Sequence, residues 1–160
     1  MVKVFLVEDE AIIRHGIRDN IDWASHGFEF AGEAGDGEYA YPLILKAQPD
    51  ILVTDIKMPF MDGLELSRLV KKALPRTRII VLSGYNEFEY AKEAIKIGIS
   101  DYLLKPVSSA GLIDALKKAA DEIREEREKS KLLERYFVSY EKYTEFLITA
   151  VLTGSSSTIF

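Results

Sequence analysis

The first 120 residues alternate short apolar runs with amphipathic stretches, and this alternation limits the folds that the chain can adopt. The apolar runs are rich in Val, Ile and Leu, which is typical of strands that are buried on both faces of a sheet. The stretches between the runs place apolar residues at helical spacing. The predicted strands are 2–7, 28–33, 51–54, 79–82 and 101–104, and the predicted helices are 10–20, 36–47, 62–74, 86–97 and one that begins near 108.

Capping and stop residues mark the ends of several predicted helices. Asp62 and Glu65 resemble a capping pair at the start of one helix, which stops before Pro75. Asn86 is the expected N-cap of the next helix, and Gly98 is its C-terminal stop. These signals give the alternation of strand and helix defined boundaries.

Five strands that alternate with helices predict an α/β fold with a doubly wound, five-stranded parallel sheet. The helices of such a fold cover both faces of the sheet. Ligands bind beyond the carboxyl ends of the strands, where the strand order reverses. The residues that end each apolar run are therefore the first candidates for a functional site.

The last helix is predicted to continue past the compact domain. Leu112, Leu116, Ala119 and Ile123 keep a 4-3-4 spacing, and a densely charged stretch follows at 121–135. We predict a domain at 1–120 and a helical extension at 121–160 with a frayed end at 154–157. The pattern favours a long extended helix, and a break near Ser139 is the alternative that stays open. The same 4-3-4 spacing, continued along the helix, falls on both apolar and polar residues: Glu126, Ser130, Leu133, Phe137, Tyr140, Thr144, Leu147 and Val151.

Charge and composition exclude several classes of function. A formal net charge of −5 argues against a nucleic-acid-binding domain, and the absence of cysteine excludes disulfides and thiolate metal sites. Residues 2–7 have neither the basic start nor the cleavage site of a signal peptide. The apolar run 146–152 is far shorter than the roughly 20 residues of a membrane span. We expect a soluble cytoplasmic chain without membrane contact.

The predicted strand ends carry the residues of a phosphoryl-transfer site. Glu8 and Asp9 follow the first strand, Asp55 ends the third, Ser83 the fourth and Lys105 the fifth. Neighbouring carboxylates repel one another, and a hard cation such as Mg²⁺ relieves that repulsion. A lysine and a hydroxyl add a cation and a donor for phosphoryl oxygens, so a carboxylate at this edge could attack phosphorus and form an acyl phosphate.

Four sequence blocks at these strand ends resemble the signature blocks of CheY-like receiver domains of two-component response regulators. The blocks are Val7–Glu10, Asp55–Gly63, Leu82–Tyr85 and Tyr102–Pro106, in this order and at suitable separations. The resemblance covers roughly 1–120. It implies a flavodoxin-like fold and a signalling switch, not a turnover enzyme, that accepts its phosphoryl group from a sensor histidine kinase.

The resemblance also implies a role for each residue of the blocks. Asp55 would be the phosphoacceptor, and Mg²⁺ (or Mn²⁺) would bind Asp55, Asp9, the backbone carbonyl of Lys57 and, through water, Glu8. By the same resemblance, Ser83 would be the switch hydroxyl and Tyr102 its aromatic partner. Lys105 would contact the phosphoryl group, and the peptide bond between Lys105 and Pro106 would be cis.

A finer resemblance concerns the stretch 83–91, which is similar to receivers of regulators with an AraC-type helix-turn-helix output domain. That domain is absent from these residues, so DNA binding and control of transcription are expected only through a part outside this chain. A second copy of the chain is a further expected partner, through the receiver face or the helical tail.

Two other functions stay open from the sequence. A Mg²⁺-dependent phosphohydrolase of the haloacid-dehalogenase kind also uses an aspartate nucleophile, but it places a second aspartate two residues on, where this chain has Lys57. A phosphate-independent scaffold or dimerisation module would be indicated by loss of Asp55, Lys105 or the acidic pair, and all of them are present.

Overall fold

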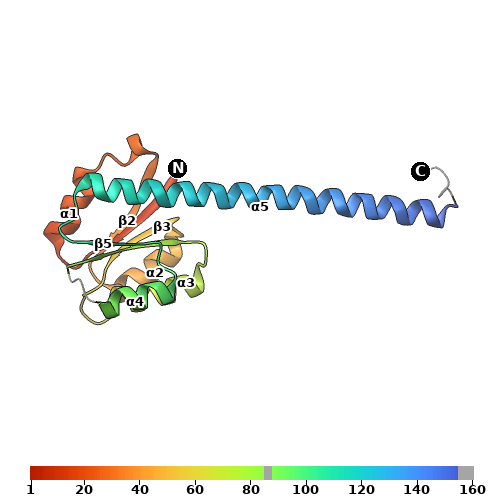
Figure 1. Cartoon of the computed structure of the whole chain (residues 1–160). Coiled ribbons are helices and arrows are strands. Elements are labelled where there is room, and N and C mark those ends of the chain that lie inside the picture. Colours follow the sequence, from red (N-terminus) through yellow and green to blue (C-terminus); the bar gives the residue numbers. More distant parts are fainter. Residues whose placement is uncertain (85–87, 155–160) are drawn as a thin grey trace. The chain divides into compact units, whose positions relative to one another are not determined.

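The computed structural model describes residues 1–84 and 88–154 and shows a five-stranded parallel sheet with strand order β2-β1-β3-β4-β5 (Figure 1). The predicted fold class is confirmed. The elements are β1 (Val2–Val7), α1 (Ala11–Asn20), the short 3₁₀ helix η1 (Ala24–His26), β2 (Phe28–Ala34), α2 (Gly37–Ala47), β3 (Ile51–Asp55), α3 (Gly63–Ala73), β4 (Arg78–Ser83), α4 (Phe88–Ile97), β5 (Asp101–Leu104) and α5 (Ser109–Leu152).

Helices cover both faces of the sheet, as the apolar strands require. Figure 1 places α2, α3 and α4 on one face and α1 with the first part of α5 on the other. Alternate residues of a strand point to opposite faces. Phe5 and Val7 accordingly pack in a cluster with residues of α2, α3 and α4, whereas Val4 and Leu6 are buried on the opposite face. Leu112 and Leu116 of α5 are also fully buried.

The predicted element ends agree with the structure to within one or two residues. Asp62 caps α3 by accepting a 2.8 Å hydrogen bond from the amide of Glu65. Gly98, which follows α4, has a φ of +84°, a conformation that glycine adopts readily. The predicted N-cap Asn86 and residues 155–157 of the predicted frayed end at 154–157 lie outside the described residues.

The sequence left open whether the last helix breaks near Ser139, and the structure shows that α5 continues to Leu152. The sequence between Leu112 and Thr153 contains no proline or glycine that would interrupt the helix. The chain divides into two compact units, Met1–Asp121 and Glu122–Phe160, and α5 contributes to both. None of the helices in the described residues is long and apolar enough to cross a membrane.

A close backbone approach holds the start of α3 against the end of β3. The amide of Gly63 donates a 2.7 Å hydrogen bond to the carbonyl of Ile56. A Cβ atom on Gly63 would lie only 1.8 Å from the carbonyl oxygen of Asp55. This position accepts glycine alone unless the backbone moves.

We expect Gly63→Ala to lower the free energy of unfolding by about 3 kcal/mol, because the added methyl group forces the loop after β3 away from Asp55. Urea unfolding followed by circular dichroism would measure the change. The matched control is Gly16→Ala in α1, where the nearest atom to the new Cβ is 3.9 Å away and alanine favours the helix. Equal effects of the two substitutions would contradict this account.

Candidate functional site

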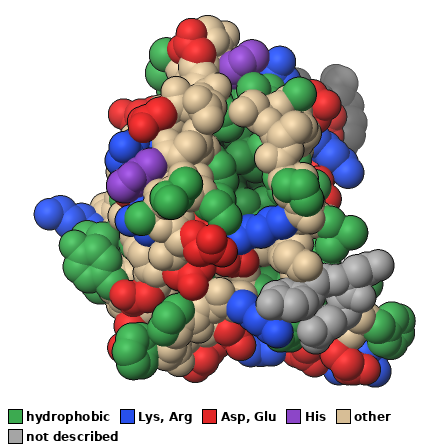
Figure 2. All heavy atoms as spheres, turned by 90° about the vertical axis from the view of Figure 1, so that its left-hand side faces the viewer, with side chains coloured by type: hydrophobic (Ala, Val, Ile, Leu, Met, Phe, Trp, Pro, Cys, Tyr) green, Lys and Arg blue, Asp and Glu red, His purple; other side chains and the backbone are tan. Residues whose placement is uncertain are grey.

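The carboxyl ends of four neighbouring strands bring the predicted site residues to one edge of the sheet. β1 pairs with β3, β3 with β4 and β4 with β5. The chain passes from β1 to β2 on one side and to β3 on the other, so the strand order reverses at β1 and β3. Ligands of such sheets bind outside this point. Figure 2 shows this edge, where acidic and basic side chains meet near the middle of the face.

Three carboxylates form a compact cluster at this edge. Glu8, Asp9 and Asp55 each place one oxygen within 4.8 Å of the others. The side chain of Glu8 is fully buried and Asp55 is only 6% exposed, so little water screens their charges. Asp9 is the most accessible of the three.

Lys105 supplies the positive charge beside this cluster. Its Nζ lies 2.8 Å from Oε2 of Glu8 and 3.1 Å from Oδ2 of Asp55. Its amide donates a 2.7 Å hydrogen bond to the carbonyl of Ser83, which fastens the end of β5 to the end of β4. The peptide bond between Lys105 and Pro106 is cis. Lys105 therefore links the end of β5 to the ends of β1 and β3 through its ion pairs with Glu8 and Asp55, and to the end of β4 through its backbone hydrogen bond.

The two buried carboxylates are also held by nearby backbone amides. Oδ1 of Asp55 accepts a 2.8 Å hydrogen bond from the amide of Ile56. Oε1 of Glu8 accepts from the amide of Glu10 at 3.3 Å. Asp55 thus uses one oxygen for the backbone and presents the other to Lys105.

Burial and mutual repulsion oppose ionisation of this cluster. Burial raises the pKa of the Glu8 carboxyl to about 7, and the charge of Asp55 adds to this, although the hydrogen bond from Lys105 lowers it. Burial likewise raises the pKa of Asp55 against the hydrogen bond from Lys105. Burial lowers the pKa of Lys105, but its hydrogen bonds and charge interactions with both carboxylates outweigh this and raise it.

The net charge of the cluster fits a divalent cation. Three ionised carboxylates and one ammonium sum to −3 + 1 = −2 for Glu8, Asp9, Asp55 and Lys105. Mg²⁺ and Mn²⁺ prefer oxygen ligands, and Mg²⁺ is commonly held by one or two carboxylates. The donor set therefore suits such an ion, which would replace the protons that the raised pKa values favour.

The two predicted switch residues lie on adjacent strands. Ser83 ends β4 and is 1% exposed. Tyr102 of β5 pairs with Val81 of β4, is half-buried and packs against the core cluster of α2, α3 and α4. Their roles stay predictions. The exposed side chain of Lys57 places its Nζ 5.9 Å from the centre of the Tyr90 ring.

Arg14 is a residue of the site that sequence analysis did not identify. One of its guanidinium nitrogens donates a 2.6 Å hydrogen bond to the backbone carbonyl of Glu8, so α1 holds the loop that carries Glu8 and Asp9. Arg14 lies six residues after Glu8 in the sequence, and this spacing is the one sequence signal that relates the two residues. No motif distinguishes Arg14 from the other charged residues of α1.

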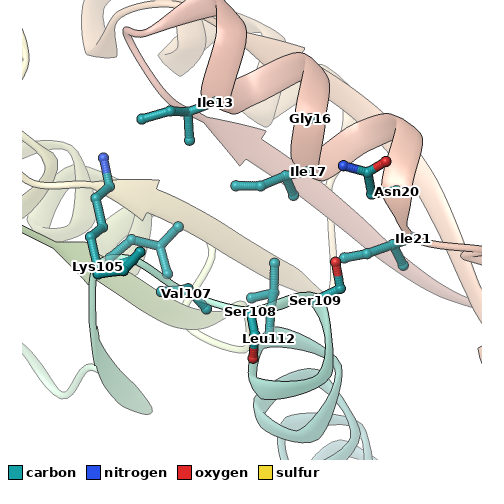
Figure 3. Close-up of a pocket in the computed structure, with 12 residues that line it drawn as sticks. Ile13, Gly16, Ile17, Asn20, Ile21, Lys105, Val107, Ser108, Ser109 and Leu112 are labelled. Atoms are coloured by element: carbon teal, nitrogen blue, oxygen red, sulfur yellow. The ribbon is translucent and has the colours of Figure 1, made fainter.

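An apolar pocket of about 460 Å³ opens beside Lys105, between α1 and the start of α5. Figure 3 shows Ile13 and Ile17 of α1 facing Val107 and Leu112 across it, with Lys105 at one end. The full lining comprises Ile13, Gly16, Ile17, Asn20, Ile21, Leu82, Lys105, Pro106, Val107, Ser108, Ser109 and Leu112.

Comparison with known proteins identifies similar chains among transcriptional regulators. The chain is 46% identical over 124 residues to the uncharacterized transcriptional regulatory protein YesN of Bacillus subtilis, covering 78% of this chain and 34% of YesN. It is 42% identical over 112 residues to the transcriptional regulatory protein HptR of Staphylococcus aureus, covering 70% of this chain and 44% of HptR. The chain therefore spans less than half the length of these relatives.

Solved receiver structures share the fold. The REC domain of AraT, a response regulator from Geobacillus stearothermophilus, superposes with a TM-score of 0.74 at 44% identity, covering 79% of this chain and 99% of that one. A two-component transcriptional regulator AraC from Clostridium phytofermentans gives a TM-score of 0.70 at 32% identity, covering 81% and 99%. The family model described as the response regulator receiver domain matches residues 4–117, which is most of the chain. This protein thus belongs to the response regulator receiver family.

Proposed function

We propose that this chain is a phosphorylation switch in which Asp55 accepts a phosphoryl group from the phosphohistidine of a sensor histidine kinase. The observation that carries the proposal is the position of Lys105, whose Nζ lies between the carboxylates of Glu8 and Asp55 at the strand-order reversal. A buried carboxylate beside a cation suits a nucleophile whose product carries additional negative charge.

The transfer exchanges one bond to phosphorus for another. A carboxylate oxygen of Asp55 attacks the phosphorus, the P–N bond to the donor histidine breaks, and the imidazole leaves with the bonding pair and takes up a proton. Lys105 stays within reach of the new phosphoryl oxygens, because it already contacts Asp55 at 3.1 Å. The amide of Ile56 keeps the other carboxylate oxygen in place.

We assign the metal site to Asp9, Asp55 and the backbone carbonyl of Lys57, with Glu8 acting through a bound water. When bound, Mg²⁺ or Mn²⁺ would neutralise the phosphoryl oxygens and the carboxylates together. The compact carboxylate cluster supports this assignment. Arg14 supports the geometry by holding the carbonyl of Glu8.

The receiver family generally acts as a signalling switch, and we propose the same for this chain instead of catalytic turnover on free phosphate esters. Ser83 would follow the phosphoryl group, and the ring of Tyr102 would fill the space that the hydroxyl leaves. Their adjacent strands and the packing of Tyr102 against the core support a coupled movement.

We infer that the kinase binds the pocket beside Lys105. The pocket is apolar and one end of it reaches the site, so a partner helix seated there could present its histidine to Asp55. Ile12, which precedes the lining residue Ile13 on α1, is 88% exposed and adds an apolar side chain to the surface of that helix. A location in the cytoplasm follows from this choice of partner, because such kinases phosphorylate their regulators there.

We assign 1–120 to the receiver and 121–160 to a helical linker. The names of the relatives support control of transcription, and the AraC-type similarity supports an output domain beyond these residues. Binding of DNA would then belong to that domain and not to this acidic chain, whose formal net charge is −5.

Incubation with acetyl phosphate should add one phosphoryl group to the chain when Mg²⁺ is present and none when EDTA replaces it. Asp55→Asn should take up none, because an amide is a poor nucleophile. Intact-mass spectrometry measures both results. Uptake by Asp55→Asn would refute the choice of acceptor, and Asp50→Asn, which lies before β3 and outside the site, is the matched control.

The metal-free chain should lose stability as the pH rises from about 4.5 to about 7. The folded state holds the proton of Glu8 more tightly than the unfolded state does, so folding is favoured at low pH and the ionised cluster opposes it above pH 7. The expected loss is up to about 3 kcal/mol, and Mg²⁺ should restore it.

Urea unfolding in EDTA at about pH 5 and about pH 8 would test this dependence. Glu8→Gln should flatten the change with pH, whereas Glu10→Gln, an exposed neighbour outside the cluster, should leave it as it is. An unchanged loss of stability in Glu8→Gln would show that another group is responsible.

A further inference from the structure

The unit that contains the second part of α5 exposes many large apolar side chains. Leu133 is 57% exposed, Phe137 59%, Tyr140 60% and Val151 66%. These four belong to a larger exposed set: Leu132, Leu133, Tyr136, Phe137, Val138, Tyr140, Tyr143, Phe146, Ile148, Val151 and Leu152. Water contact with this much apolar surface is unfavourable, so the helix is suited to an apolar partner.

Part of this set follows a heptad repeat. With positions named a to g, Phe137 and Val151 fall on a, and Leu133, Tyr140 and Leu147 fall on d. The a and d positions of a helix form one seam that a second helix can cover. Leucine at d together with a β-branched residue at a favours a parallel coiled coil of two helices. Thr144 and Ser130 occupy the other two a positions.

The polar residues in the seam are compatible with burial. The hydroxyl of Thr144 donates a 2.9 Å hydrogen bond to the carbonyl of Tyr140 in the same helix, so burial of this hydroxyl leaves it with a partner. Polar residues at a positions specify register at some loss of stability. Glu126 falls on a d position, where two copies would repel each other, so the apolar part of the seam begins after it.

Charges beside the seam match a parallel second copy. In a parallel pair, each g residue meets the e residue five positions later on the other helix. Lys129 at g would meet Glu134 at e of the second copy. The two charges are opposite, and symmetry forms the pair twice. An antiparallel arrangement joins g to g and e to e, so this pair would not form.

A different seam through the exposed tyrosines fits less well. It would run along Leu133, Tyr136, Tyr140 and Tyr143, and it would place Lys129 on a d position facing its own copy. That seam leaves no opposite charges at its flanking e and g positions near 129–134. The register through Phe137 therefore has the better charge arrangement.

We propose that residues 129–151 of α5 form a parallel, in-register two-stranded coiled coil with a second copy of this chain. The seam consists of Ser130, Leu133, Phe137, Tyr140, Thr144, Leu147 and Val151, with Lys129 and Glu134 as flanking charges. This pairing is independent of phosphorylation at Asp55, which lies in the other unit.

Sedimentation equilibrium of the full chain tests the pairing. The wild type should sediment at twice its mass of 18.1 kDa, and Leu133→Asp should weaken association more than about 100-fold, because it buries two unpaired carboxylates. Leu132→Asp is the matched control: it is 67% exposed on the same helix and lies outside the seam, so it should still associate. A monomeric wild type, or equal behaviour of the two variants, would overturn the proposal.

Charge reversal tests the parallel orientation. Lys129→Glu should weaken association about tenfold, because it places a glutamate opposite Glu134 at both symmetry-related contacts, and adding Glu134→Lys should restore it. Lys131→Glu makes the same charge change outside the seam and should have little effect. Failure of the double variant to recover would exclude the parallel register. Asp55→Asn should associate like the wild type, which separates this test from that of phosphorylation.

Discussion

The contact of Lys105 with Glu8 and Asp55 is the interaction on which the site depends. Both carboxylates are buried, and each would be unfavourable as an isolated charge in that environment. The ammonium of Lys105, 2.8 Å from Glu8 and 3.1 Å from Asp55, offsets part of their repulsion and joins residues at the ends of the first, third and fifth strands. Their raised pKa values show that this compensation is incomplete, which is why the cluster suits a divalent cation.

The surrounding backbone keeps this incompletely compensated cluster in place. Gly63 allows the start of α3 to lie against the carbonyl of Asp55, and Ile56 donates its amide to the Asp55 carboxylate. Arg14 holds the carbonyl of Glu8 from α1. In the proposed switch, Asp55 would be a nucleophile whose two oxygens are held, with a cation nearby, before any donor arrives, and such positioning assists phosphoryl transfer.

The two units carry separate tasks in the proposed switch. The first unit contains the carboxylate cluster, Lys105 and the apolar pocket, which in the proposed switch receive the phosphoryl group. The second unit carries no comparable cluster in its described part, but its exposed apolar seam suits a second copy of the chain. Constitutive pairing of the tails would keep two receivers together, so that phosphorylation would act on a pair that already exists.

The sequence by itself determined the fold class, nearly all element boundaries and the residues at the strand ends, because apolar periodicity and capping residues are local signals. It also placed Glu8, Asp55 and Lys105 at one edge, since parallel strands end together. Only the tertiary structure decided that Lys105 touches both carboxylates and that Arg14 holds Glu8. Those facts depend on side-chain contacts between distant segments and on packing, which no local pattern of residues specifies.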